Sequence, residues 1–187
     1  MTTSTPRSSL PTRLLRLSVA AALGLASSTL AACDGPSQSA TATPSVGASA
    51  PALSGVDLHG QPFELSAQAG KVVIVDFWAS WCEPCKRAMP GLEALAAEYA
   101  GQVVVVGVSV DDDPVKMREF VERMGVSFVV IHDADDAIAS RWAPPTMPTT
   151  YVIDSLGGVA AVHEGYDETM GAEALRDEID ALLDVGP

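Results

Sequence analysis

The sequence predicts an α/β domain in which a central sheet is covered on both sides by helices. From residue 53 onward, apolar segments typical of buried strands alternate with amphipathic helical segments. The chain is 48% hydrophobic and 19% charged, which is the composition of a globular domain rather than of a disordered chain or a coiled coil. The 187 residues contain no internal repeat, so a solenoid architecture is not expected.

The predicted strands follow one another from the start of this domain. Residues 56–65 are typical of two short strands around a turn at His59-Gly60, which form an N-terminal β-hairpin. Residues 72–77 are apolar except for Asp76, as expected of a strand that is buried on both faces. Further strands are predicted at residues 103–110 and 128–131, and a hairpin of residues 150–153 and 159–162 turns at Gly157-Gly158.

Three helices are predicted between and after these strands. The first spans about residues 83–99, with an apolar stripe at Leu92, Leu95, Ala96 and Tyr99. The second begins at Asp113-Pro114 and ends at Gly125, because proline suits a first helical turn and glycine ends a helix. The third is marked by Leu175, Ile179 and Leu182. The alternation predicts a central mixed sheet flanked by helices.

Residues 1–32 have the layout of an export signal. A basic start at Arg7, Arg13 and Arg16 precedes a short apolar run over residues 17–26, which is too short for a membrane span. The segment Leu30-Ala31-Ala32-Cys33 resembles the bacterial lipoprotein box, in which the cysteine sulfur receives a diacylglycerol. We therefore expect lipid attachment at Cys33; the alternative is an ordinary secretory signal followed by a chance cysteine.

The stretch after Cys33 predicts a tether. Residues 34–52 are almost entirely Ser, Ala, Thr, Pro and Gly without apolar periodicity, so they are expected to form a flexible linker. The predicted organisation is a signal peptide over residues 1–32, a lipidated cysteine and tether over 33–52, and a folded domain over 53–187. This places the protein in the cell envelope, anchored to the outer side of the cytoplasmic membrane, which is the periplasmic face in a Gram-negative cell.

Charge and residue counts exclude several classes of protein. Twenty-four acidic residues against 11 basic ones give a net charge of −13, the wrong sign for a nucleic-acid-binding protein. Three cysteines are too few for a disulfide scaffold or a four-thiolate zinc site. The histidines at 59, 132 and 163 share no ligand spacing, and the aspartates at 111–113 are expected to cap the helix at Pro114 rather than bind calcium. No metal and no cofactor are predicted.

The reactive chemistry is expected at Cys82-Glu83-Pro84-Cys85, a Cys-x-x-Cys motif at a strand-to-helix turn. The N-terminus of a helix carries unpaired N–H groups and a partial positive charge, which would stabilise the Cys82 thiolate and lower its pKa. Cys85 lies one turn further into the helix, near enough to form a disulfide and more buried. Cys82 is therefore predicted to be the attacking nucleophile and Cys85 the resolving thiol.

These residues resemble the thioredoxin superfamily. The matching segments are Asp76-Phe77-Trp78-Ala79, Trp81-Cys82-Glu83-Pro84-Cys85-Lys86, Pro90, and Met147-Pro148-Thr149. The hairpin at residues 56–65 and the Cys-Glu-Pro-Cys motif are similar to the membrane-tethered branch of TlpA/ResA-like thiol-disulfide oxidoreductases, which often serve cytochrome c maturation. The resemblance covers about residues 53–185 and implies a thioredoxin-like fold and a monomer.

The resemblance assigns roles to residues around the motif. Pro148 is expected in the cis form, so that the Met147 backbone pairs with a substrate strand. The residues expected to contact substrate are Trp81, Glu83, Pro84, Met147, Pro148 and Thr149. Trp78 and Trp142 are expected to pack in the core. Glu83 opposes thiolate formation and favours a reducing potential, whereas Lys86 acts in the other direction.

Asp76 is the third predicted catalytic residue. An acid inside a buried strand is costly unless it is paired or used, and burial should raise its pKa. The corresponding aspartate of thioredoxin moves protons for the resolving cysteine. The membrane-tethered branch often has a glutamate at the place of Ala88 instead, and the lysine that accompanies the aspartate in thioredoxin is replaced here by Gly107. Asp76 is therefore expected to be the acid–base group, without a cationic partner.

The resulting hypothesis is an extracytoplasmic reductase of disulfides in exported proteins, recharged by a membrane thiol electron donor. The nearest alternative is a disulfide oxidant or isomerase, which the sequence separates from a reductase only weakly. A copper chaperone on this fold would use Cys-x-x-x-Cys with a histidine. A peroxiredoxin would need a threonine where Ala79 stands.

Overall fold

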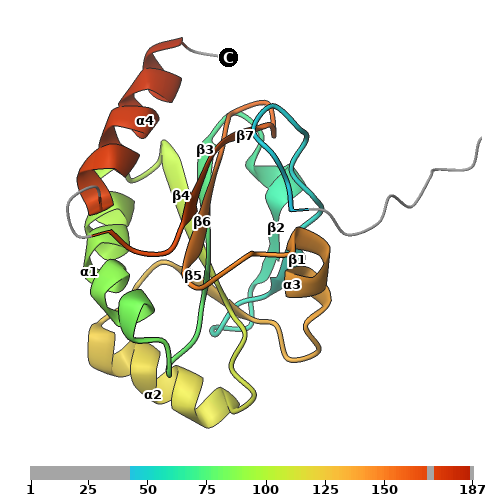
Figure 1. Ribbon diagram of the computed structural model, residues 1–187, viewed down its shortest axis with the longest axis vertical. Helices are drawn as coiled ribbons and strands as arrows, with labels where there is room; N and C mark the ends of the chain where they lie inside the picture. The colour runs from blue at the N-terminus through green and yellow to red at the C-terminus, as the bar shows by residue number, and fades with distance from the viewer. Residues whose placement is uncertain (1–42, 168–170, 186–187) are drawn as a thin grey trace, which may run out of the picture. The chain divides into compact units, whose positions relative to one another are not determined.

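The computed structural model describes residues 43–167 and 171–185 (Figure 1). A five-stranded mixed sheet has the order β5-β4-β3-β6-β7, and β1 and β2 form a separate two-stranded antiparallel sheet. The strands are β1 (Ser54–Val56), β2 (Pro62–Glu64), β3 (Val72–Trp78), β4 (Val103–Ser109), β5 (Val129–His132), β6 (Thr149–Ile153) and β7 (Val159–Glu164). The helices are α1 (Glu83–Glu98), α2 (Pro114–Met124), α3 (Ala137–Trp142) and α4 (Gly171–Val185), with a 3-10 turn at Leu65–Gln68. The predicted α/β fold class and the N-terminal hairpin are confirmed.

Strand β3 is the centre of the sheet. It pairs in parallel with β4 and antiparallel with β6, and all seven of its residues are buried. A run of valine, isoleucine and aromatic side chains suits this position, because both faces of the strand are covered. The chain leaves β3 at Trp78 and enters α1 at Glu83, so the Cys-x-x-Cys turn lies at the carboxyl end of the central strand.

The sheet is covered by two layers, which Figure 1 shows on either side of it. The helices α1, α2 and α4 pack on one face, where Leu92, Leu95 and Ile179 contact Ile74 and Val105 of the sheet. The hairpin and α3 cover the other face, where Phe63 and Trp142 lie in one apolar cluster with Phe77 and Tyr151. The buried positions of Trp78 and Trp142 confirm that both tryptophans pack in the core.

The start of the folded part corrects one prediction. Residues 43–52 do not behave as a flexible tether: Pro44 is buried, and the backbone N–H groups of Gly47 and Ala50 donate to Val159 O and Gly157 O at 2.8 and 2.9 Å. Backbone hydrogen bonds hold this segment, and they need no apolar side-chain pattern. The folded region therefore begins about ten residues before the predicted boundary at residue 53. The predicted signal peptide and Cys33 lie outside the described residues.

Segments near the N-terminus run along both edges of the sheet. Ser49 forms an antiparallel bridge with Gly158 beside β7, and Asp57 forms one with Ile131 of β5. The backbone N–H of Leu58 donates to Val130 O at 3.2 Å. Within the described residues, no helix is long and apolar enough to cross a membrane.

Candidate active site

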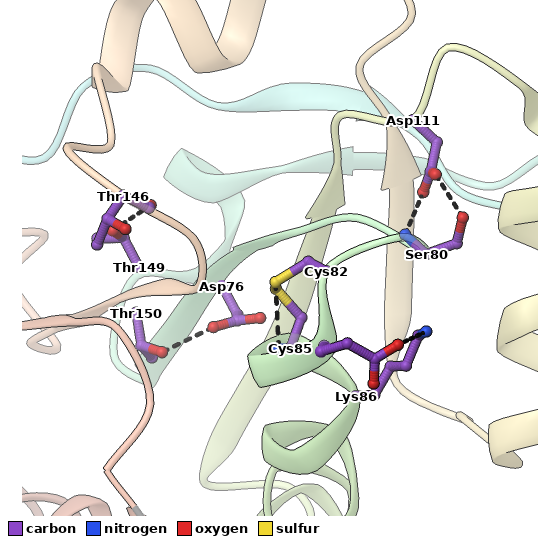
Figure 2. Close-up of a disulfide and its surroundings, with 10 residues drawn as sticks. Asp76, Ser80, Cys82, Cys85, Lys86, Asp111, Thr146, Thr149 and Thr150 are labelled. Carbon is purple, nitrogen blue, oxygen red and sulfur yellow. Dashed lines mark hydrogen bonds and ion pairs between the residues drawn. A yellow bond between two sulfur atoms is a disulfide. The ribbon is translucent and has the colours of Figure 1, made fainter.

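A disulfide joins Cys82 and Cys85 at the N-terminus of α1 (Figure 2). Cys82 is the N-cap residue of the helix, and its Sγ accepts a hydrogen bond from the backbone N–H of Cys85 at 3.2 Å. Pro84 lies in the first turn, where the missing N–H of proline costs nothing. Cys82 is 6% exposed and Cys85 is fully buried, so Cys82 is the more accessible sulfur, as the motif predicts.

The surface around the disulfide combines an aromatic side chain with an ion pair. Trp81 is 62% exposed, although most tryptophan side chains are largely buried. Glu83 and Lys86 form an ion pair and hydrogen bond one turn apart, and this contact lowers the pKa of Glu83. The pair offsets both charges beside the cysteines, so the expected effect of Glu83 on the thiols is reduced by its neighbour.

The Met147–Pro148 segment lies at the same end of the sheet. The peptide bond between these residues is cis, which confirms the expectation for Pro148. Thr149 pairs with Phe77 near the end of β3, and its Oγ1 donates to Thr146 O at 2.8 Å. Phe77 directly precedes the turn that carries Cys82. Register therefore brings the proline segment to the disulfide, although about 60 residues separate them in sequence.

Asp76 is buried behind the disulfide. Its side chain is 1% exposed, and in Figure 2 it lies between Thr150 and the two cysteines. Thr150 Oγ1 donates a hydrogen bond to Asp76 Oδ1 at 2.7 Å, whereas Asp76 Oδ2 has no protein partner. Burial raises the pKa of Asp76 to about 7, against a smaller lowering by the Thr150 hydroxyl. A carboxyl group with this pKa can bind or release a proton near neutral pH.

Gly107 explains why β4 supplies no cation to Asp76. It is the register partner of Asp76 on β4, as the sequence comparison with thioredoxin predicted. A Cβ atom at this position would lie 2.7 Å from Trp78 Nε1 and 3.1 Å from Phe128 Cε2. The buried Trp78 indole therefore takes the space that a lysine side chain would need, so the pKa of Asp76 stays high.

Asp111 is a site residue that the sequence analysis missed. Its carboxylate accepts hydrogen bonds from Ser80 N at 2.9 Å, Ser80 Oγ at 2.6 Å and Ser109 Oγ at 2.8 Å. These bonds fasten the turn that leads to Cys82 onto the carboxyl end of β4 (Figure 2). Of the three aspartates assigned to helix capping, Asp113 is the N-cap of α2. The available signal was the place of Asp111, directly after a strand at the sheet edge where sites form in α/β folds.

The described residues contain no group of three or more His, Cys, Asp or Glu side chains placed to hold a metal ion. His132 Nε2 contacts Asp111 O at 2.7 Å, and His163 Nε2 contacts Glu178 Oε2 at 2.8 Å. His59 is exposed in the turn between β1 and β2. The three histidines thus lie in three separate environments.

The site and fold match known proteins. The sequence pattern of the redoxin family matches residues 45–181. The chain belongs to the redoxin family. This redoxin is 32% identical over 138 residues to the thiol-disulfide oxidoreductase ResA of Geobacillus thermodenitrificans, which covers 73% of this chain and 78% of that protein.

Solved structures agree with the sequence match. A Chlorobium tepidum protein assigned as thiol:disulfide interchange protein DsbE has a TM-score of 0.71 at 32% identity, over 75% of this chain and 99% of that one. A secreted Mycobacterium tuberculosis disulfide oxidoreductase homologous to E. coli DsbE has a TM-score of 0.62 at 27% identity, over 70% and 96% of the two chains. This redoxin is therefore a thiol-disulfide oxidoreductase of the ResA/DsbE type with a thioredoxin-like fold.

Proposed function

We propose that this redoxin reduces disulfide bonds of exported proteins outside the cytoplasm, using Cys82 and Cys85 as its dithiol and Asp76 as its acid–base group. The observation that carries the proposal is the layered arrangement of the site. Cys82, which is 6% exposed, caps the helix, the fully buried Cys85 lies one turn further in, and a buried carboxyl with a pKa of about 7 lies behind both.

The first step is the attack of Cys82 on the client. The helix N-terminus favours the thiolate form of Cys82 in the reduced protein. The thiolate forms a bond with one client sulfur and breaks the client disulfide, and the released client sulfur takes up a proton. Trp81 and the Met147 backbone flank the disulfide and are proposed to hold the client strand, with Pro84 and Pro148 shaping the groove. Thr149 is fully buried, so the expected contact of this side chain with substrate is replaced by a supporting role through its hydrogen bond to Thr146 O.

The second step resolves the mixed disulfide. The ionised carboxylate of Asp76 takes the proton of the Cys85 thiol, and the Cys85 thiolate attacks Cys82 Sγ. The Cys82–Cys85 bond forms and the bond between Cys82 and the client breaks. Two electrons have then passed from the dithiol to the client, and the protein is left in the oxidised form seen in the structure.

The direction of transfer requires a reductant. In an oxidising compartment a dithiol has to be regenerated, so we propose a membrane thiol donor that reduces Cys82–Cys85 after each turnover. Apocytochrome c, with its Cys-x-x-Cys-His site, is the client class that the resemblance to the membrane-tethered branch suggests. The ResA relative supports thiol-disulfide exchange, and the contribution of Glu83 to a reducing potential is smaller than expected because Lys86 offsets its charge.

The proposed place of action rests on the signal-like residues 1–32 and on Cys33. We propose that the protein is lipid-anchored through Cys33 on the outer side of the cytoplasmic membrane and acts as a monomer. Cys33→Ser should move the protein from the membrane fraction to the soluble fraction, and size-exclusion chromatography of the soluble form should give one chain per particle. Retention of C33S in the membrane fraction would contradict lipid anchoring.

The reduction potential of Cys82–Cys85 tests the reductase proposal. The purified protein is titrated in defined thiol buffers, with tryptophan fluorescence as the signal. A potential near or below about −250 mV supports a reductase that depends on a membrane donor. A potential between about −180 and −120 mV would mean a disulfide oxidant or isomerase, and the cytochrome client would be withdrawn.

A further inference from the structure

A row of polar side chains crosses the sheet from Asp76 to the surface. Asp76 on β3 is the register partner of Thr150 on β6, and Thr150 is the register partner of His163 on β7. Directly opposed residues of antiparallel strands point to the same face of the sheet, with Cβ atoms about 5 Å apart. The three side chains therefore form one line on the face that α1 and α4 cover.

The line ends in a contact between a histidine and a glutamate that reaches solvent. His163 Nε2 lies 2.8 Å from Glu178 Oε2 on α4, and the two side chains are 27% and 34% exposed. At the inner end, Thr150 Oγ1 already donates to Asp76 Oδ1 at 2.7 Å. Direct contacts therefore join Asp76 to Thr150 and His163 to Glu178. The remaining step, from Thr150 to His163, has no direct hydrogen bond between these two described side chains.

A cavity of about 410 Å³ lies at that step. Thr150 and His163 both line it, together with Pro148 and three small residues, Ala88, Gly91 and Ala172. The volume is enough for several water molecules, since a water occupies about 30 Å³ in the liquid. The Thr150 hydroxyl and the His163 ring are both polar groups of residues that line this cavity, so water in it can bridge them.

The charged and titratable groups around the row are few on the inner side and acidic on the outer side. Asp76 is paired in register with Gly107 on β4. Its pKa is raised by burial and lowered to a smaller extent by the hydrogen bond from Thr150. His163 faces Glu178 on α4, and Glu164, Tyr166 and Asp167 also line the cavity. Arg87 stacks on the Tyr166 ring at 5.7 Å, so this cation is engaged at the rim.

We propose that Asp76, Thr150, His163 and Glu178 form the route by which the proton taken from Cys85 leaves the site, with Thr150 and His163 as positioning residues. This inference rests on the acid–base role proposed for Asp76. After Asp76 has accepted the proton, it passes it to Thr150 Oγ1 while the Thr150 hydroxyl gives its own proton to a water in the cavity, and this water passes a proton to His163. The His163–Glu178 pair then exchanges the proton with solvent, which returns Asp76 to the carboxylate.

The test measures repeated turnover, because Asp76 has to release its proton before each new resolution step. The purified protein is supplied with excess oxidised glutathione and dithiothreitol, and the rate of disulfide exchange above the uncatalysed rate is measured between pH 5.5 and 9. We compare the wild type with His163→Ala, Thr150→Val, Thr150→Ser and Asp76→Asn. His59→Ala serves as the matched control, because His59 is exposed in the β1–β2 turn.

His163→Ala should slow turnover at pH 7 by about tenfold, which is less than the roughly 100-fold or more that a group acting directly on the reacting atoms contributes. Imidazole added to the solution should restore most of the rate, and H59A should behave as the wild type. Thr150→Val should move the midpoint of the pH profile upward, because the hydroxyl that favours the ionised carboxylate is lost. Thr150→Ser should keep the wild-type midpoint.

Each contrary result has one meaning. Wild-type rates in H163A, or a slow H163A that imidazole does not restore, would overturn the route while leaving Asp76 in its role. The same midpoint in T150V and T150S would overturn the part given to Thr150. An unchanged pH profile in D76N would instead overturn the proposed acid–base role of Asp76 itself.

Discussion

Asp76→Asn should stabilise the oxidised protein at alkaline pH. The pKa of Asp76 is about 7 in the folded protein, against 3.8 for the unperturbed group. Between these values the folded protein keeps a proton that the unfolded chain has released, so the free energy of unfolding falls as the pH rises. The full effect is present below pH 3.8 and lost above pH 7. A difference of about three pH units, at about 1.4 kcal/mol each, amounts to about 4 kcal/mol.

The asparagine removes this dependence at a cost. Its amide would place an N–H₂ group where Asp76 Oδ2 has no protein partner, and a buried unpaired donor costs about 1–3 kcal/mol. The net gain of D76N at pH 8 should therefore be about 1–3 kcal/mol. At pH 5 the wild type has lost only about 1.6 kcal/mol of the total, so the net effect of D76N should be lower by about 2–3 kcal/mol and lie near or below zero. The stability difference between wild type and variant therefore changes with pH.

Urea unfolding of the oxidised protein at pH 5 and pH 8 measures both values, with tryptophan fluorescence as the signal. Asp112→Asn is the matched control, because Asp112 is exposed and should leave the pH dependence of the wild type unchanged. If D76N and the wild type lost the same free energy of unfolding between pH 5 and pH 8, Asp76 would not hold a proton in the folded state near neutrality. The catalytic argument built on its pKa would then fail.

Three further changes test other parts of the site. Cys85→Ser should trap Cys82 in a covalent adduct with a disulfide-bearing client, seen as a mass increase that dithiothreitol reverses, whereas Cys82→Ser should give no adduct; equal trapping by both would reverse their assigned roles. Gly107→Ala should lower the free energy of unfolding by about 1–3 kcal/mol, since its Cβ meets Trp78 Nε1 at 2.7 Å, and an unchanged urea midpoint would show that the indole can move. Asp111→Ala should cost about 2 kcal/mol and slow thiol exchange, because the Ser80 donors lose their partner; normal exchange in a destabilised variant would limit Asp111 to a role in stability.

The sheet and its three longer helices were predictable because the spacing of apolar residues along each segment indicates which residues are buried. Strand β3 is apolar except for Asp76, and α1 and α2 begin where they were predicted, with Cys82 and Asp113 as their N-cap residues. Helix α3 was not predicted, since its six residues are too few to show a period. The helix is held by Asp133, which accepts hydrogen bonds from the backbone N–H groups of Ile138 and Ala139 at 3.0 and 2.7 Å. No local sequence pattern predicts this contact.

The candidate site divides in the same way. The cysteine pair, Pro148 and the burial of Asp76 followed from spacing, resemblance and the cost of placing an acid in an apolar strand. The place of Asp111 after a predicted strand was a signal for a site residue, but its contact could not be predicted, because the direction of its side chain depends on Ser80, which lies 31 residues earlier in the chain. The row from Asp76 to His163 depends on strand register, and register becomes visible only when β3, β6 and β7 are paired.

The β-bridges at the two outer strands of the sheet affect the tendency of this protein to aggregate with other extended chains. An open strand at the side of a sheet invites a foreign strand to add to it, which leads to aggregation. Here Ser49 occupies the backbone beside β7, and Asp57 and Leu58 occupy that of β5. Both outer strands are therefore partly paired within the chain, which leaves less open strand backbone for a foreign strand to join. Part of the stretch that was predicted to be a tether therefore covers an edge of the sheet. Shortening it within residues 43–52 should lower the solubility of the protein while its redox activity is retained.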